Sequence, residues 1–396
     1  MSEVVLSHEV ASVVDEVVTL RRDLHQHPEL AFEEYRTAAL VAERLRSLGL
    51  EPRTGIAGTG VTALVGNGQG PTLLLRADMD ALPVQEENEV PYRSTVPGKM
   101  HACGHDGHTA MLLGLAKLLA ERRETLPGRV KLCFQPAEER GGGARPMIEA
   151  GVLADPPVDA AFAMHLWASL PTGTIATAPG PLLAASDAIT IQIRGKGGHA
   201  ASPAECVDPV LVGAQLVTAL QSVVSRNVEA HQAAVVSITQ FHAGDADNVI
   251  PDSATLNGTV RTFDGAVRSR IERRLQTLVE QTAAAFGATA ELDYQHGYPA
   301  VVNEPTMTNL VSRAAAEVVG EEAVLPLGPV MGAEDFAYFL REVPGCFFVV
   351  GINNEAKGTG QPHHNPRFDL DEDALGIGVE VMLRVVERAL EALARR

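Results

Sequence analysis

Three strand-like runs, residues 72–76, 129–135 and 159–165, end in or lead into side chains that bind metal ions. The first run is almost continuously apolar, as is typical of a strand buried in a parallel sheet. Sheets of this kind place their ligands outside the carboxyl ends of the strands. Each polar end alone also fits a turn, a helix cap or a solvated loop. Their recurrence favours an α/β fold with a functional site at one edge of the sheet.

The side chains at these run ends are carboxylates and one imidazole. Asp78 and Asp80 follow the first run, Glu138 and Glu139 follow the second, and His165 ends the third. Because neighbouring side chains point in different directions, two adjacent carboxylates can have different roles. One of them can bind a metal ion while the other transfers protons.

Residues 101–108 are unusually dense in metal-binding side chains, with three histidines, one cysteine and one aspartate. On an extended segment Cys103 and His105 project to the same side, and Gly104 lets the backbone approach closely. A thiolate with an imidazole suits zinc or a similar ion better than calcium or magnesium. The alternative is a polar helix start beside a buried cysteine, since an Ala- and Leu-rich helix is expected at 109–119.

The hydrophobic pattern changes near residue 186. From there to residue 296 we expect the order strand, helix, strand, strand, helix, strand, which describes a ferredoxin-like sandwich. The expected elements are 187–194, 208–225, 233–241, 255–263, 266–286 and 289–294. The sequence thus predicts a catalytic domain formed by residues 1–185 and 297–396, with residues 186–296 inserted as a separate α+β domain.

The flanking segments predict the remaining helices and strands of the catalytic domain. The expected helices are 10–24, 33–48, 306–319, 334–341 and 372–394, and the additional strands are 60–65 and 346–350. His25 and His27 follow the first helix, where surface or capping roles are expected. His363 and His364 occupy a proline-bounded loop before the closing helix, and His364 is the fifth candidate ligand.

Charge, cysteine spacing and hydropathy exclude several classes of protein. With 50 acidic and 32 basic residues the formal charge is -18, which argues against a nucleic-acid-binding surface and requires a local cation for any anionic substrate. The four cysteines lie far apart, which favours a reducing compartment over a disulfide framework. The chain shows no membrane-spanning run, and its start lacks the pattern of a secretory leader. We expect a cytoplasmic protein.

Taken together, the candidate residues supply enough ligands for two metal ions and leave one carboxylate over. The candidate ligands are Cys103, His105, Glu139, His165 and His364, and the remaining carboxylate is Glu138. Residues from separate strand ends and loops of one α/β layer predict a dinuclear hydrolase.

The chain closely resembles the dinuclear metallo-amidohydrolases that include aminoacylases, hippurate hydrolases and the plant enzymes that split indole-acetyl amino acid conjugates. The motifs that carry the resemblance run in family order through nearly the whole chain. They are Arg76–Pro83, Met100–His108, Gln135–Glu139, Gly195–Ala200, Asn248–Pro251, Gly258–Phe263 and Gly332–Phe336. The implied fold is a mixed-sheet, zinc-exopeptidase-like catalytic domain with an inserted lid and dimerisation domain.

The resemblance implies that the five candidate ligands hold two divalent ions (Zn, Mn, Co or Ni) and that Glu138 is the general base. Asp80 is expected beside Glu138, where it helps to set the charge of that base. The wider superfamily has a metal-binding histidine where this chain has Asp78, so the role of Asp78 is open. Asp106 and His108 are expected to contact the metal ligands and orient them without binding the ions themselves.

The resemblance also implies a homodimer, or a higher homo-oligomer, in which His199 reaches the partner's active site and stabilises the oxyanion. Asn248 and Arg261 are implied to hold the carboxylate of a small N-acyl amino acid. A planar guanidinium suits that task in an acidic protein. The expected activity is hydrolysis of the amide bond of such substrates. One alternative is a metallocarboxypeptidase acting on short peptides. The other is a metal-dependent binding protein without activity, which predicts that the base or a ligand is missing, and none is missing.

Overall fold

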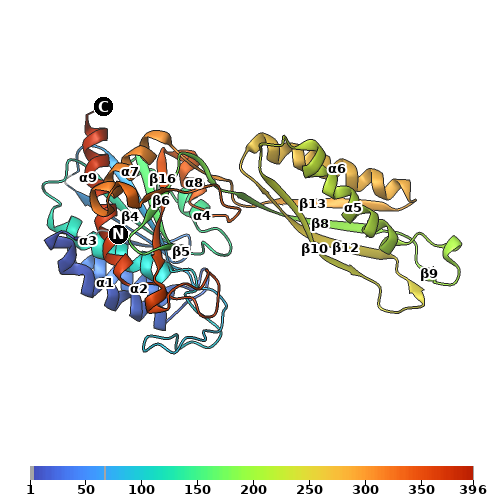
Figure 1. Cartoon of the computed structure of the whole chain (residues 1–396), viewed down its shortest axis with the longest axis horizontal. Coiled ribbons are helices and arrows are strands. Elements are labelled where there is room, and N and C mark those ends of the chain that lie inside the picture. Colours follow the sequence, from blue (N-terminus) through green and yellow to red (C-terminus); the bar gives the residue numbers. More distant parts are fainter. Residues whose placement is uncertain (1–3, 67, 396) are drawn as a thin grey trace. The chain divides into compact units, whose positions relative to one another are not determined.

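The computed structural model describes residues 4–66 and 68–395, and residues 1–3, 67 and 396 of the expected domains lie outside this part. The chain forms two compact units (Figure 1). Unit 1 comprises Met1–Gly180, Val302–Gly328 and Asp335–Arg396, and unit 2 comprises Pro181–Val301 and Pro329–Glu334. Within the described residues, no helix has the length and apolar character that a membrane crossing needs.

Unit 1 is built on an eight-stranded mixed sheet with the order β1-β2-β4-β3-β5-β16-β6-β15. The central strands β4, β3, β5 and β16 run parallel to one another, and β2 and β6 are antiparallel to their neighbours on this core. The strands are β1 (Arg53–Ile56), β2 (Gly60–Gly66), β3 (Thr72–Asp78), β4 (Arg129–Gln135), β5 (Ala160–Pro171), β6 (Ile175–Thr177), β15 (Val324–Pro326) and β16 (Gly345–Asn353). The predicted α/β class with a mixed sheet is confirmed.

Burial explains this strand order. All seven residues of β3 are buried, which is possible only when both faces of the strand are covered. Helix α3 packs against the sheet, and α1 and α9 pack against α3. The helices of unit 1 are α1 (His8–Gln26), α2 (Tyr35–Ser47), α3 (His105–Glu121), α4 (Ala144–Glu149), α7 (Pro305–Val319), α8 (Ala337–Glu342) and α9 (Asp373–Ala394).

Among the expected boundaries that differ from the structure, two affect the site. Helix α3 begins at His105 instead of residue 109, after Gly104 in a left-handed conformation with φ 89°. Its first turn is polar because it faces the site, and the hydrophobic period therefore misses it. Strand β5 continues past His165 to Pro171, because residues 166 and 167 pair with Val350 and Gly351 of β16. His165 thus lies within a strand and not at its end.

Unit 2 is an antiparallel sheet with the order β10-β12-β8-β13, covered by α5 and α6 (Figure 1). Burial alternates along β8, whose Ile189, Ile191 and Ile193 join the core beneath these helices. The elements are β8 (Ala185–Arg194), α5 (Pro209–Asn227), β10 (Ala234–Ala243), β12 (Ser253–Thr262), α6 (Gly265–Ala285) and β13 (Thr289–His296), with short β9 (Gly198–His199) and β11 (Val249–Ile250). This is the predicted β-α-β-β-α-β order. The short strands β7 (Gly180–Leu183) and β14 (Val301–Asn303) lie where the chain passes between the units.

A buried carboxylate links three elements of unit 2. The Asp187 side chain on β8 is 1% exposed and pairs with the Arg268 guanidinium of α6. It also accepts hydrogen bonds from the Tyr294 hydroxyl (2.6 Å) and the Gly297 N–H (3.1 Å). Burial raises the pKa of Asp187, but the bonds from Arg268 and Tyr294 outweigh burial and hold it below its ordinary value.

We expect Asp187→Asn to lower the free energy of unfolding of unit 2 by about 3 kcal/mol at neutral pH, because Arg268 loses its buried partner. Because the pKa of Asp187 is lower in the folded state, the ionised carboxylate stabilises the fold at pH values above its unfolded-state pKa of about 4. This stabilisation is lost as the pH falls through the folded-state pKa. The difference between the two proteins should therefore shrink in acid. Urea unfolding between pH 3 and 7 measures it. Asp293→Asn, an exposed change on β13, is the control, and an equal effect of both changes would contradict the assignment.

Candidate metal centre

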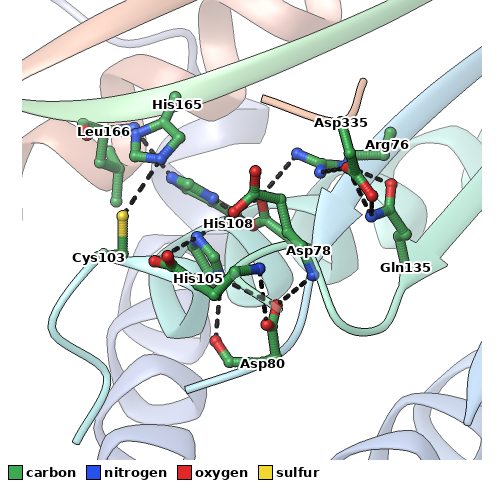
Figure 2. Close-up of polar contacts among 12 residues, drawn as sticks. Arg76, Asp78, Asp80, Cys103, His105, His108, Gln135, His165, Leu166 and Asp335 are labelled. Carbon is green, nitrogen blue, oxygen red and sulfur yellow. Dashed lines mark hydrogen bonds and ion pairs between the residues drawn. The ribbon is translucent and has the colours of Figure 1, made fainter. Parts of the chain in front are cut away.

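The five predicted ligands come together in unit 1. The ligand atoms of Cys103, His105 and His165 lie within 4.8 Å of one another, and so do those of Cys103, Glu139 and His364. The two groups share Cys103, which lies just before α3. Figure 2 shows Cys103, from the segment before α3, together with His105 of α3 and His165 of β5. Two overlapping groups of this composition fit a pair of divalent ions.

Hydrogen bonds fix which imidazole nitrogen faces the centre. His105 Nδ1 lies 2.9 Å from the Asp80 carbonyl oxygen, and His165 Nδ1 lies 2.7 Å from the Leu166 carbonyl oxygen. A carbonyl only accepts, so each Nδ1 carries a proton, and in the neutral ring each Nε2 offers a lone pair. His165 Nε2 lies 3.6 Å from the Cys103 sulfur. Both rings are thus oriented as metal ligands are.

Two buried atoms of this cluster make no well-aligned hydrogen bond in the part of the chain that the structure describes. They are His105 Nε2 and Glu139 Oε1, which lie 4.0 Å apart, and Glu139 Oε1 has only an ion-pair contact with His364 Nε2 at 3.1 Å. Leaving buried polar atoms unsatisfied is costly. A cation that accepts lone pairs from both atoms removes this cost. The orphaned atoms and the mixed donor set therefore fit a metal centre.

The charges of the cluster are those of a site that exchanges protons for metal. Burial raises the pKa of the Cys103 thiol, and the Glu139 and Glu138 carboxylates raise it further. Burial disfavours a charged His105, but Asp78 and Asp80 outweigh it and raise its pKa to about 10. Without metal both groups therefore hold their protons at neutral pH. Metal binding must displace these protons, because thiolate and neutral imidazole are the binding forms.

Asp80 holds the backbone that carries both glutamates. Its two carboxylate oxygens each accept one bond of 3.0 Å, from the N–H groups of Glu138 and Glu139. Asp80 is buried just beyond β3, and the glutamates follow β4, the neighbouring parallel strand. The residue expected beside Glu138 thus contacts its main chain.

The remaining predicted residues lie in unit 2, at two ends of its sheet. His199 pairs with Val249, and the Ala200 N–H donates to the Asn248 carbonyl oxygen (3.1 Å), so His199 and Asn248 are neighbours. They lie beyond the end of the sheet where Ser253 pairs with Arg194. Arg261 pairs with Ser186 at the opposite end. Eight residues of strand separate Ser253 from Arg261, which corresponds to about 25 Å.

Comparison with known proteins identifies the family. The model of peptidase family M20/M25/M40 matches residues 74–388. The chain belongs to this family. Among similar relatives, YhaA of Bacillus subtilis, named as an amidohydrolase, is 46% identical over 93% of this chain and 93% of its own length. Thermostable carboxypeptidase 2 of Saccharolobus solfataricus is 43% identical (94% and 95% covered), and N-acetylcysteine deacetylase of Bacillus subtilis is 42% identical (95% and 97% covered).

A solved member of the M20 family has the same architecture. The YXEP protein of Bacillus subtilis, described as a dinuclear metal-binding peptidase, superposes with a TM-score of 0.85 at 38% identity. The match covers 96% of this chain and 99% of that one. This likeness supports the fold and a dinuclear metal centre for the present M20 protein.

Asp78, whose role the motif left open, joins a buried chain of contacts in this M20 protein (Figure 2). It lies 2.6 Å from the Arg76 guanidinium and 2.5 Å from His108 Nδ1. His108 Nε2 accepts the Leu166 N–H at 2.9 Å, and the Leu166 carbonyl accepts from His165. Burial opposes the ionisation of Asp78, but Arg76, His105 and His108 hold its pKa well below its ordinary value. Asp78 is therefore linked to the candidate ligand His165 through His108 and the main chain of Leu166.

The expected surface or capping role of His25 is wrong. His25 is fully buried, and its Nδ1 lies 2.8 Å from the Asp106 carboxylate, which Arg21 also binds at 2.8 Å. Asp106 belongs to the first turn of α3, directly after His105. His27 is the C-cap residue of α1. The helical period indicates that His25 is buried, because His25 follows Arg21 and Val17 by four and eight positions and therefore shares their face of α1, but it does not indicate the partner Asp106.

Proposed function

We propose that this M20-family protein hydrolyses the amide bond of N-acyl amino acids and releases a carboxylic acid and a free amino acid. The observation that carries the proposal is Glu138, a buried carboxylate next to the ligand cluster on a backbone that Asp80 holds. The amidohydrolase and deacetylase names of its relatives support the same reaction.

In this proposal Cys103, His105, Glu139, His165 and His364 hold two divalent ions, which when bound polarise the amide carbonyl and acidify water. Glu138 takes the proton of the attacking water and passes it to the leaving amine. Asp80 keeps Glu138 in place through its main chain. The water oxygen first adds to the amide carbon, and the C–N bond then breaks as Glu138 gives its proton to the nitrogen, so that a carboxylic acid and an amine leave.

We assign substrate anchoring to Arg261. Its half-buried guanidinium donates to Thr259 Oγ1 and to the Val260 carbonyl, and no carboxylate of the described residues forms an ion pair with it. Burial lowers the pKa of Arg261, with Asp187 opposing the shift, and the group stays a cation. A planar cation without a carboxylate partner fits the carboxylate of the substrate.

We further propose that the active site is shared across a dimer. His199 and Asn248 lie about 25 Å from Arg261 along the sheet of one chain, too far to touch the same small substrate. If His199 and Asn248 act, they come from one subunit and Arg261 from the other. The long edge strand β10, with exposed Phe241, offers a surface for self-association.

Zinc, manganese, cobalt and nickel are the candidate ions, since thiolate, imidazole and carboxylate together suit such metals. A thiolate ligand is vulnerable to oxidation, so we place the protein in a reducing compartment such as the cytoplasm. Chelated protein reloaded with each metal should be assayed on hippurate, N-acetyl amino acids and short peptides. Turnover of peptides alone would favour the carboxypeptidase function, which is named for one relative. No turnover with any metal would contradict the proposal.

Arg261→Ala should raise KM about 10–100-fold with little change in kcat, as expected for loss of a hydrogen bond to a charged group, about 1.5–3 kcal/mol. The reason is that the guanidinium binds the carboxylate equally in the ground state and the transition state. Steady-state kinetics on a substrate and on its carboxamide analogue measure the effect, because wild type should prefer the carboxylate and Arg261→Ala should not. Arg273→Ala, an exposed arginine on α6, is the control. A fall in kcat with KM unchanged would contradict this role.

A further inference from the structure

Glu34 is a fully buried carboxylate outside the proposed chemistry. It precedes α2 at the N-cap position, yet its side chain makes no capping bond to that helix. Its Oε1 instead accepts the N–H groups of Phe32 (3.0 Å) and Ala137 (2.9 Å), and its Oε2 accepts the Thr59 hydroxyl (2.5 Å). Ala137 directly precedes Glu138. A residue before α2 thus contacts the loop that carries the proposed base.

The backbone of Ala137 needs such support. Its φ is 56°, in the left-handed region that residues with a Cβ rarely occupy. Its carbonyl accepts the N–H groups of Gly142 (3.0 Å) and Gly143 (3.1 Å), so both sides of the residue are held. A Cβ on Gly143 would lie 1.9 Å from the Pro136 oxygen, which shows how tightly the loop closes. Strained backbone of this kind persists where the surroundings over-determine it.

The N–H groups of residues 137, 138 and 139 all donate to buried carboxylates. Ala137 donates to Glu34, and the next two residues donate to the two oxygens of Asp80. We propose that Glu34 is a positioning residue that holds Ala137 in its left-handed conformation and thereby aims Glu138. This inference rests on the proposed function of Glu138 as the base.

The loop contacts Glu34 through oxygen acceptors, which a neutral side chain can also supply. Burial raises the pKa of Glu34 against the opposing bond from Thr59, and the nearby Asp80 carboxylate adds to the shift. Glutamine keeps the oxygen that binds Phe32 and Ala137. Its NH₂ group can donate to the Thr59 hydroxyl, which rotates to accept.

The test compares kcat in Glu34→Ala and Glu34→Gln at saturating metal. Glu34→Ala should lower kcat about 100-fold, which is the loss expected when a catalytic group is displaced by about 1 Å. KM and metal content should change little. Glu34→Gln should stay close to wild type. Glu29→Ala is the matched control, because that carboxylate accepts the N–H groups of Arg36 and Thr37 and does not touch the loop. It should lower stability without a selective loss of kcat.

A second variant tests the backbone directly. Glycine adopts positive φ without strain, so adding Ala137→Gly to Glu34→Ala should recover part of the lost kcat. Hydrogen exchange provides a readout besides activity, since amides 137–139 should lose protection in Glu34→Ala but not in Glu29→Ala. If Glu34→Ala behaves as the control does, or if Ala137→Gly gives no recovery, the proposal is overturned. Glu138→Gln, assayed in parallel, separates the outcomes, because its full activity would overturn the proposed base itself.

Discussion

Replacing Glu138 with glutamine is expected to lower kcat by about 10²–10⁴-fold while the metal content stays near normal. The amide has nearly the same shape but cannot take a proton from water. The five candidate ligands, which do not include Glu138, are enough to hold both ions, so the metal should remain. Metal analysis after dialysis, together with kcat on an N-acyl amino acid, measures both quantities.

Glu139→Gln is the matched variant on the neighbouring residue. Glu139 Oε1 lies 3.1 Å from His364 Nε2, and the pKa of Glu139 is low because His364 and His105 outweigh its burial. Its loss should reduce metal occupancy, and activity should recover partly at high metal concentration. The contrast matters because Glu138 also lies within ligand distance of His105 and Glu139. Equal metal loss in the two variants would contradict the assignment of Glu138 as the base and Glu139 as a ligand.

The fold was predictable where side-chain pattern reflects burial. The continuous apolar run of β3 predicts an α/β unit and the alternation of β8 predicts an inserted α+β unit, and the structure has both. The hydrophobic pattern gives wrong boundaries where polar side chains of the site are buried. The polar first turn of α3 faces the site, so the pattern places the start of the helix four residues late. Strand β5 continues past a buried histidine, so the pattern places the end of the strand at His165.

The candidate ligands were predictable because cysteine, histidine and glutamate clusters are rare and chemically distinctive. Their supporting contacts were not, because these depend on residues distant in the chain. In the sequence, Glu34 is one of two adjacent acidic residues in the first turn of the helix expected at 33–48, and its partner Ala137 looks like an ordinary loop alanine. Only the fold brings them to 2.9 Å and gives Ala137 a positive φ. His25 likewise met Asp106 only through the packing of α1 on α3.

His199→Ala should lower kcat by about 10²–10³-fold, the usual loss for one oxyanion donor. The exposed ring is suited to donation, because the Ala201 N–H donates to Nδ1 (3.1 Å). A neutral His199 therefore carries its own proton on Nε2, which is free to face a substrate. Asn248 lies beside it and should arrive from the same subunit.

Sharing of the site makes this loss recoverable. When His199→Ala and Glu138→Gln chains form a mixed dimer, one site combines both defects and the other combines an intact Glu138 with an intact His199. Co-expression with two affinity tags and tandem purification isolates such dimers, which should show about half of the wild-type kcat per dimer, as two-fold symmetry requires. Each variant alone should stay near its own low activity. Mixed dimers without recovery would mean that His199 acts within its own chain or not at all, and the shared site would then be wrong.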